Sequence, residues 1–551
     1  MTKRIGFIVL IAVLVVHALL APIAKASPLT AAESTYADLN DANSVVGAID
    51  SGLFASYRGK DRAAWNQEFQ AKRAALAGQL SALDVHGLSP ADARVLEILR
   101  AKLKSFAEDP ASEGSQSGRC ADSKNGAFSS KALSSSLVGC FTEIANNLQF
   151  EGGRIDRASA LTQLHELDDP GRRKALFYSF EPLWRAVNGN DEPDSPYRRL
   201  IAQAAVDTRT AGSPIDAAAR TVGVTSEEIE RWLVRILETW CEVTRGDVVE
   251  PWDYRYAAGA ADRVVAPHMA RLALLDLDHR FYRDLGADLG KLGVLYDLEP
   301  RPDKSSVAYT DFLIHGRSVA GEWQPTIARV LASYRSSNLG SLNELVHENG
   351  HAVHISAIRN RPAYVDWNDD LFVEAFADVP SWSVYEPAWQ QHYLGVAAPE
   401  RDSLRALYGS VMLDVAWALF EARMLHDPKA DPNAVWTDIT HRYLHIVAHP
   451  ELSWWAVRVQ LVDLPGYMVN YGLGSVLTAD IRERVRHEIG SFDTGNPRWY
   501  PWLTDHLLRF GSERDTPTLL KTFLGRPVSA DALLAQIRRL GPSQSIYKSG
   551  S

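Results

Sequence analysis

The segment His347-Glu348-Asn349-Gly350-His351 constrains the fold of this chain more than any other part of the sequence. Side chains four residues apart share one face of an α-helix, so both histidines reach one metal ion only if the segment is helical. Glu348 then lies about 100° further around the helix, beside the open position of that ion. This pattern favours a zinc-dependent hydrolytic site. The alternative is a pair of ordinary histidines on a solvated helix face.

The residues around this motif predict a helix. Ser341-Leu342-Asn343-Glu344 matches the capping box, in which a serine hydroxyl and a glutamate carboxylate satisfy the first N–H groups of a helix. Gly350 is a poor helix former, and its place between the histidines indicates close packing against a second helix. We interpret His354, one turn beyond His351, as a helix histidine with satisfied hydrogen bonds rather than a substrate contact.

A third metal ligand must come from elsewhere in the chain, since catalytic zinc usually has three protein ligands. The helical pattern at Leu371–Asp378 carries acids at Glu374 and Asp378, and the apolar residues around Glu374 indicate a largely buried helix. We predict that Glu374 binds the metal and that Asp378, one turn further along, accepts a hydrogen bond from a ligand histidine. The reverse assignment, with Asp378 as the ligand, stays open.

Amphipathic helical patterns dominate the rest of the chain. They cover residues 30–105, 140–245, 260–292 and most of the sequence beyond 360, and a polar loop is predicted at 109–139. Strand character is clear only in Ser306–Ile314 and in a second short run within Pro325–Tyr334. The sequence therefore predicts a mainly-α fold with a small β-sheet beside the motif helix. We divide it into an N-terminal helical region, 27–245, and a catalytic region, 246–551.

The N-terminus has the features of a secretory signal peptide. Lys3 and Arg4 precede the apolar run Ile5–Leu20, which is followed by the cleavage pattern Ala24-Lys25-Ala26. We predict cutting after Ala26 and export to the periplasm or the extracellular space. The alternative is an uncleaved membrane anchor. The apolar run is short for this role, because a spanning helix needs about 20 apolar residues. We expect no stable membrane association after signal removal.

The net charge bears on which partners the protein can bind, and the cysteines bear on whether it forms a disulfide. Loss of the signal peptide would change the formal net charge from -10 to -13, and this acidic balance disfavours nucleic acid as a partner. In an exported protein, Cys120 and Cys140 are placed to close a polar loop as a disulfide. Cys241 lies in a strong helical pattern and is predicted to be a buried free thiol.

Five sequence blocks together suggest a family. They are Pro251-Trp252-Asp253-x-x-Tyr256, Arg301-Pro302-Asp303-Lys304 with Ala308-Tyr309, the histidine motif, Phe372-Val373-Glu374-Ala375, and Gly466-Tyr467-x-x-x-Tyr471. In these blocks the chain resembles zinc oligopeptidases of the thimet oligopeptidase and oligoendopeptidase F family, which are gluzincins, and more distantly angiotensin-converting enzyme. Two features depart from the family. The ligand spacing is shorter, and Val462 stands where the family has a histidine, so that Arg458, Gln460 or His449 would have to replace it.

The resemblance implies a two-lobed helical shell around a deep channel and cleavage of short unstructured peptides. It implies one zinc ion held by His347, His351 and Glu374, with Glu348 as general base. It also implies an oxyanion donor, for which we favour Tyr471 and then Tyr467.

Other activities stay open at this stage. The first alternative is a metallocarboxypeptidase or peptidyl dipeptidase, which needs a cation for the substrate's C-terminal carboxylate; the sequence singles out no arginine or lysine for that role. The second is a catalytically inactive peptide-binding protein. In the peptidase readings, extended substrate is expected to pair with the strand at Ser306–Thr310 through main-chain hydrogen bonds.

Overall fold

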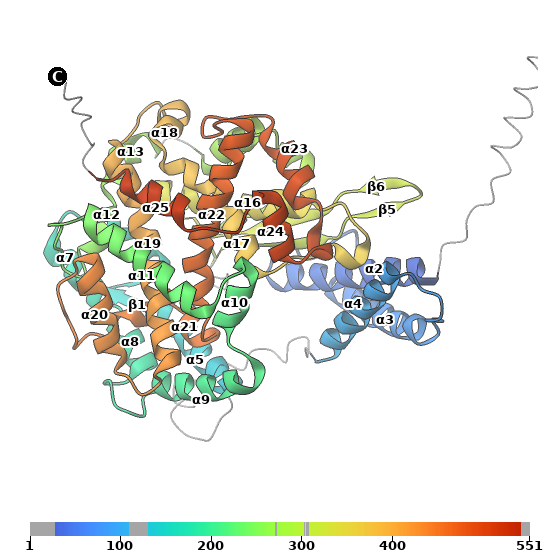
Figure 1. Ribbon diagram of the computed structural model, residues 1–551, viewed down its shortest axis with the longest axis horizontal. Coiled ribbons are helices and arrows are strands. Elements are labelled where there is room, and N and C mark those ends of the chain that lie inside the picture. The colour runs from blue at the N-terminus through green and yellow to red at the C-terminus, as the bar shows by residue number, and fades with distance from the viewer. Residues whose placement is uncertain are drawn as a thin grey trace, which may run out of the picture.

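A computed structural model describes residues 28–108, 130–269, 273–301, 304, 308–334 and 336–541. The predicted signal peptide, Cys120 and residues 109–129 of the predicted loop lie outside these ranges. Helices make up most of the described chain (Figure 1), so the mainly-α fold predicted from the sequence is confirmed. Over these ranges, no helix has both the length and the apolar character needed to cross a bilayer.

The helices fall into three groups along the chain. The N-terminal group is α2 (Pro28–Asp50), α3 (Arg62–Ser81) and α4 (Pro90–Glu108). The middle group is α5 (Ser130–Ala145), α6 (Arg157–Glu166), α7 (Pro170–Tyr178), α8 (Glu181–Asn188), α9 (Pro196–Ala211), α10 (Pro214–Val222), α11 (Ser226–Val243), α12 (Tyr254–Ala258), α13 (Ala260–Met269), α14 (Leu274–Asp284) and α15 (Leu289–Leu292). The C-terminal group is α16 (Leu339–Ala357), α17 (Asp370–Ser381), α18 (Pro387–Leu394), α19 (Glu400–His426), α20 (Pro432–Leu444), α21 (Gln460–Asp463), α22 (Met468–Ile489), α23 (Trp499–Leu503), α24 (Thr516–Leu524) and α25 (Asp531–Arg538).

A three-stranded sheet lies against α16, as the sequence predicts. Its strands are β3 (Leu295–Asp297), β4 (Tyr309–Ile314) and β7 (Ile327–Leu331), in the order β3-β7-β4. β7 pairs in parallel with β3 and antiparallel with β4, with Thr310 opposite Val330. β4 is therefore an edge strand. Two further hairpins are formed by β1 (Leu148–Phe150) with β2 (Gly153–Ile155), and by β5 (Arg317–Val319) with β6 (Glu322–Gln324).

Two hydrophobic cores organise these elements. The larger core runs from Leu133 in α5 to Leu540 near the end of the described chain, and it includes α16, α17, α19 and α22. The smaller core joins α2, α3 and α4 to Leu313 and Ile314 of β4. Figure 1 shows α2–α4 standing to one side of the main helical body. The sheet therefore connects the N-terminal helices to the motif helix.

The structure corrects the predicted loop at 109–139 in its last ten residues. Residues 130–139 begin helix α5, in which Leu133, Leu137 and Phe141 are buried. These residues recur one turn apart, and burial of that apolar face outweighs the low helix propensity of the intervening serines. Cys140, in the same helix, is disulfide-bonded. Cys241 is a free thiol as predicted, but it is only half-buried.

Candidate metal centre

Helix α16 carries the histidine motif and begins earlier than the sequence suggested. Its N-cap is Asn338, whose side chain accepts a hydrogen bond from the Ser341 N–H at 2.8 Å. The predicted capping box at Ser341 is therefore wrong. Asparagine is as good an N-cap as serine, and the backbone of Asn338 is extended, as that position requires.

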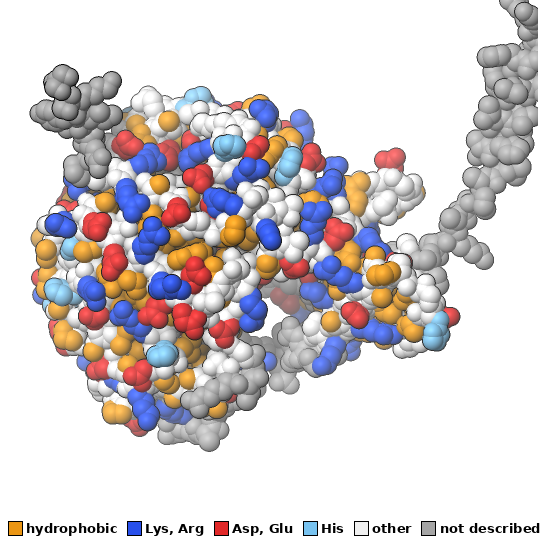
Figure 2. All heavy atoms as spheres, viewed as in Figure 1, with side chains coloured by type: hydrophobic (Ala, Val, Ile, Leu, Met, Phe, Trp, Pro, Cys, Tyr) orange, Lys and Arg blue, Asp and Glu red, His pale blue; other side chains and the backbone are white. Residues whose placement is uncertain are grey.

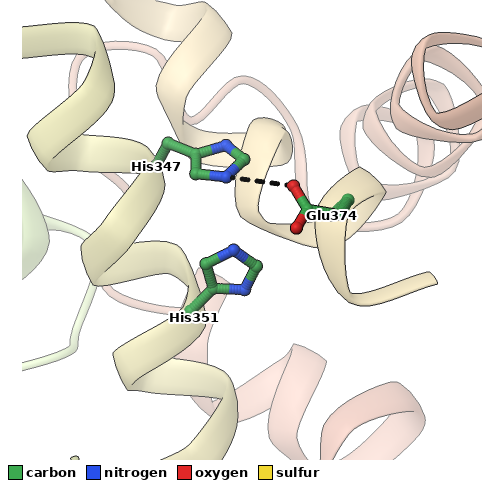
Figure 3. A group of neighbouring side chains, drawn as sticks. All are labelled: His347, His351 and Glu374. Atoms are coloured by element: carbon green, nitrogen blue, oxygen red, sulfur yellow. Dashed lines mark ion pairs between the residues drawn. The ribbon is translucent and has the colours of Figure 1, made fainter. Parts of the chain in front are cut away.

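His347, His351 and Glu374 converge in space (Figure 3). One candidate ligand atom from each lies within 4.8 Å of the others. His347 Nε2 and Glu374 Oε2 are 3.5 Å apart, and two ligands of a tetrahedral zinc ion are about 3.4 Å apart when each is about 2.1 Å from the metal. The nitrogen and oxygen donors and their spacing therefore fit a zinc ion with three protein ligands and one open position.

Gly350 allows the two ligand-bearing helices to approach. A Cβ atom at this position would lie 2.7 Å from Ala377 Cα and 2.8 Å from the Ala377 carbonyl oxygen. Both are backbone atoms of α17, so neither could move without separating the helices. The close packing predicted from this glycine is confirmed, and it brings Glu374 to the histidines of α16.

Asp378 lies beside the other nitrogen of His347. His347 Nδ1 is 2.7 Å from Asp378 Oδ1, and the Ser381 hydroxyl donates to the same oxygen at 3.0 Å. Burial lowers the pKa of His347, but Asp378 and Glu374 outweigh it and raise that pKa well above its ordinary value. The carboxylates thus stabilise positive charge at this position. The arrangement favours Glu374 as ligand and Asp378 as the acid that orients His347.

The next two histidines of α16 are enclosed by aromatic rings. His351 packs against Trp367, with ring centroids 5.7 Å apart, and burial together with the charge of His347 lowers its pKa to about 4. His354 lies among Trp367, Phe372 and Phe376 and is fully buried. Neither ring nitrogen of His354 has a hydrogen-bond partner among the described residues. The prediction of a satisfied histidine is therefore wrong, although His354 is also not exposed to substrate.

Glu348 is buried beside the metal group and has one side-chain partner within the described residues. The Thr310 hydroxyl of β4 lies 2.7 Å from Glu348 Oε2. Burial raises the pKa of Glu348 to about 7, against the lowering effects of His347 and Thr310. A carboxylate with a pKa near neutrality is suited to both accepting and returning a proton. Sequence reasoning missed Thr310 because a strand pattern alone does not say which residues face α16.

Tyr467 and Tyr471 lie at the start of α22, with ring centroids 5.7 Å apart. Burial and then the negative charge of Glu374 raise the pKa of both phenols, so both hydroxyls are in their donating form. Gln460 Nε2 donates to the Tyr471 hydroxyl at 3.4 Å, and the Arg458 guanidinium lies 5.1 Å from the centroid of the Tyr471 ring.

The next residues are Val462 and the three candidates considered from the sequence to replace the histidine of the resembled family. Val462 is fully buried and does not contribute to the site. Of the three substitutes considered from the sequence, Arg458 and Gln460 both contact Tyr471. His449 instead lies between Glu250 and Glu451, with nitrogen-to-oxygen distances of 2.9 and 2.7 Å.

Two arginines that were not found from the sequence lie near Arg458. Arg157 Nε donates to the Val457 carbonyl oxygen at 2.7 Å, next to Arg458, and Arg255 lies close enough to both for their charges to interact. Burial and mutual repulsion lower the pKa of Arg157 to about 9 and that of Arg255 to about 10. Arg458 forms an ion pair with Asp414, whereas Arg157 and Arg255 form no salt bridge with any described residue. We call Arg157, Arg255 and Arg458 the arginine cluster. Its members come from distant segments, so no local motif could have revealed it.

The metal group lies between the interior and the solvent. Glu348 and His351 are buried, whereas His347 and Glu374 are partly exposed. On the outer face seen in Figure 2, the described acidic and basic side chains are interspersed without a large area of one sign.

Similarity to known proteins is found in structure rather than in sequence. No protein-family model matches this chain, and no curated protein matches it in sequence. The structure is similar to that of an M32 carboxypeptidase from Deinococcus radiodurans R1, with a TM-score of 0.57 and 17% identity, covering 93% of this chain and 97% of that one. It is also similar to a solved structure described as "The Structure of CHT", with a TM-score of 0.51 and 14% identity, covering 94% and 99%. At these identities the likeness establishes a shared fold alone, and the oligoendopeptidase resemblance stays a prediction.

Proposed function

We propose that this protein is a zinc-dependent peptidase that removes residues from the C-terminus of short, unstructured peptides. The metal group and the arginine cluster are the observations that carry this proposal. The burial of Glu348 and His351 supports peptides rather than folded proteins as substrates, because a folded chain would not reach these side chains.

The proposed chemistry uses residues with distinct tasks. A zinc ion held by His347, His351 and Glu374 supplies Lewis acidity that activates water and polarises the peptide carbonyl. Glu348 accepts a proton from the attacking water and returns it to the leaving amine. Tyr471 donates a hydrogen bond to the oxyanion of the tetrahedral intermediate, and Tyr467 is the second choice for this donor.

The arginine cluster supports exopeptidase over endopeptidase action. Arg157 and Arg255 are partly exposed and form no ion pair with a described residue, so two guanidinium groups in one place are suited to an anionic ligand. The C-terminal carboxylate of a peptide is the anion that a carboxypeptidase must hold. Arg157 and Arg255 therefore supply the cation that the sequence alone did not identify. The carboxypeptidase named in the structural comparison is consistent with this proposal.

A pair of peptides that differ only at the C-terminus tests the proposal. We expect the peptide with a free carboxylate to be shortened and its C-terminal amide to be resistant, as followed by mass spectrometry. Single-residue steps indicate a carboxypeptidase, and two-residue steps indicate a peptidyl dipeptidase. Internal cleavage of the amide at an equal rate would contradict the exopeptidase proposal.

Substitution in the arginine cluster gives a second test. Arg255→Met should raise KM for the free peptide by roughly 10- to 100-fold, since one charge-assisted hydrogen bond is lost. Zinc content should stay unchanged. Arg172→Met is a matched control because Arg172 is exposed and pairs with Glu151 on the surface. Unchanged kinetics in the Arg255 variant would argue against carboxylate binding at the cluster.

An oligopeptidase that cuts internal bonds is the second candidate. The five sequence blocks favour it, and so does the free edge of β4, which can pair with an extended peptide through main-chain hydrogen bonds. Such pairing does not require a free C-terminus. The amidated peptide described above therefore separates the two candidates.

We further propose that the protein is exported. The N-terminal signal pattern motivates this, and the disulfide at Cys140 supports it because disulfides persist in oxidising compartments. Expression with the native N-terminus should yield an exported chain whose first residue follows Ala26. An uncut chain retained in the cytoplasm would contradict the proposal.

A further inference from the structure

Thr310 is placed to control the side chain of Glu348. Its Oγ1 atom lies 2.7 Å from Glu348 Oε2 and 2.9 Å from the Glu348 backbone oxygen. Thr310 is paired with Val330 inside the three-stranded sheet, so its hydroxyl is held on a regular element rather than on a loop. Among the described residues, no other side chain is hydrogen-bonded to the Glu348 carboxylate.

The hydroxyl has one proton and two nearby acceptors, so it donates to only one of them at a time. Both acceptors belong to Glu348, and each lies within hydrogen-bond distance of the hydroxyl. Thr310 is therefore held against both the backbone and the carboxylate of this one residue.

We propose that Thr310 is a positioning residue that holds the Glu348 carboxylate in one rotamer beside the metal group. This inference rests on the proposed role of Glu348 as general base. A glutamate side chain has three rotatable bonds, and misplacement of a reacting group by about 1 Å can cost roughly 100-fold in rate. Fixing the carboxylate from the sheet removes that freedom.

Two substitutions separate the hydroxyl from the shape of the side chain. Thr310→Val replaces the hydroxyl with a methyl group and suits a strand equally well. Thr310→Ser keeps the hydroxyl. We expect Thr310→Val to lower kcat by roughly 10- to 100-fold with KM and zinc content unchanged, and we expect Thr310→Ser to keep most of the activity.

Thr326→Val is the matched control. Thr326 is a buried threonine near the same sheet, and its hydroxyl accepts a hydrogen bond from the Gly316 N–H at 2.9 Å, away from Glu348. This variant should lose stability without losing kcat. A loss of kcat in the serine variant equal to that in the valine variant would overturn the positioning role, as would full activity of Thr310→Val in a protein whose Glu348→Gln variant is inactive.

A structural readout keeps the inference testable if the protein proves not to be a peptidase. Crystal structures of the metal-free wild type and Thr310→Ser should show Glu348 in one rotamer, and Thr310→Val should show it in several. A single unchanged rotamer in Thr310→Val would overturn the inference whatever the activity. If all variants and Glu348→Gln have the same activity but the rotamers differ as expected, the proposed function fails and the positioning role stands.

Discussion

The two sides of helix α16 both hold buried carboxyl groups, but in different surroundings. On the side toward the metal group, Glu348 lies close to His347 and contacts the Thr310 hydroxyl. On the opposite side, Asp278 accepts a hydrogen bond from Asn349 at 2.8 Å, and its Oδ1 atom has no partner among the described residues. Burial raises the pKa of Asp278 well above its ordinary value. The carboxyl group toward the metal group thus lies beside a histidine that stabilises its charge, whereas on the opposite side burial favours the protonated form of Asp278.

The face of α16 opposite the metal group is anchored by hydrogen bonds of Asn349. Asn349 also accepts a hydrogen bond from the Tyr296 hydroxyl at 2.8 Å, so it links Asp278 to the sheet. These neutral contacts fix the rotation of α16 about its axis. That rotation determines where His347 and His351 point.

The largest expected effect is the loss of activity when Glu348, on the side of α16 toward the metal group, is replaced. Glu348→Gln should lower peptidase activity by roughly 100- to 10,000-fold, the range that general-base catalysis supplies, because the amide accepts no proton. The zinc content should equal that of the wild type, since Glu348 is not a proposed ligand. Turnover by Glu348→Gln at the wild-type rate would refute its role. Absence of activity in the wild type as well would favour the peptide-binding alternative.

The next effect distinguishes the two acids of α17. Glu374→Ala should abolish tight zinc binding, whereas Asp378→Ala should weaken it by roughly 10- to 100-fold, because loss of an acid that orients a histidine ligand has that effect. Competition with a zinc chelator measures both affinities. If Asp378→Ala loses the metal and Glu374→Ala keeps it, the ligand assignment is reversed.

A smaller effect is expected where the two helices touch. Gly350→Ala should lower the free energy of unfolding by about 1–3 kcal/mol, as overpacking typically does, because the new methyl group meets the Ala377 backbone. Chemical denaturation measures this loss. Gly474→Ala in α22 is a control, since its Cβ would meet no atom within 4 Å. Equal stability of the Gly350 variant and the wild type would show that the helices are further apart than described.

The smallest expected effect is on the side of α16 opposite the metal group and depends on pH. The folded state keeps the Asp278 proton to a higher pH than the unfolded state does, so this group's stabilising contribution is present below the unfolded pKa and is lost as pH rises. The slope approaches about 1.4 kcal/mol per pH unit above pH ~4. Asp278→Asn removes that slope and should be relatively more stable at pH 8 than at pH 4. Parallel stability curves for variant and wild type would contradict a raised pKa at Asp278.

Local patterns predicted the centre of the site, and distant contacts supplied the rest. The spacing within the histidine motif and the acids at Glu374 and Asp378 follow from helix periodicity, which a sequence displays directly. The cap of α16 was misplaced because Asn338 and Ser341 are both good N-cap residues, and only the backbone geometry chooses between them. His354 was misread because the aromatic rings around it come partly from a loop.

The arginine cluster could not be predicted from the sequence. Arg157, Arg255 and Arg458 lie in three segments about 100 to 200 residues apart, and no spacing rule links them. Their common feature is proximity to one another with one ion pair, Arg458 with Asp414, among the described residues, and this exists only in the folded chain. The orientation of Thr310 has the same origin, since it depends on which face of β4 packs against α16.

A crystal structure of the zinc-soaked protein, with anomalous scattering measured at the zinc edge, tests the central claim most directly. We predict one strong anomalous peak per chain, about 2.1 Å from a nitrogen of His347, a nitrogen of His351 and a carboxylate oxygen of Glu374. A peak at Asp378 instead of Glu374, or no peak between the two histidines, would contradict the account.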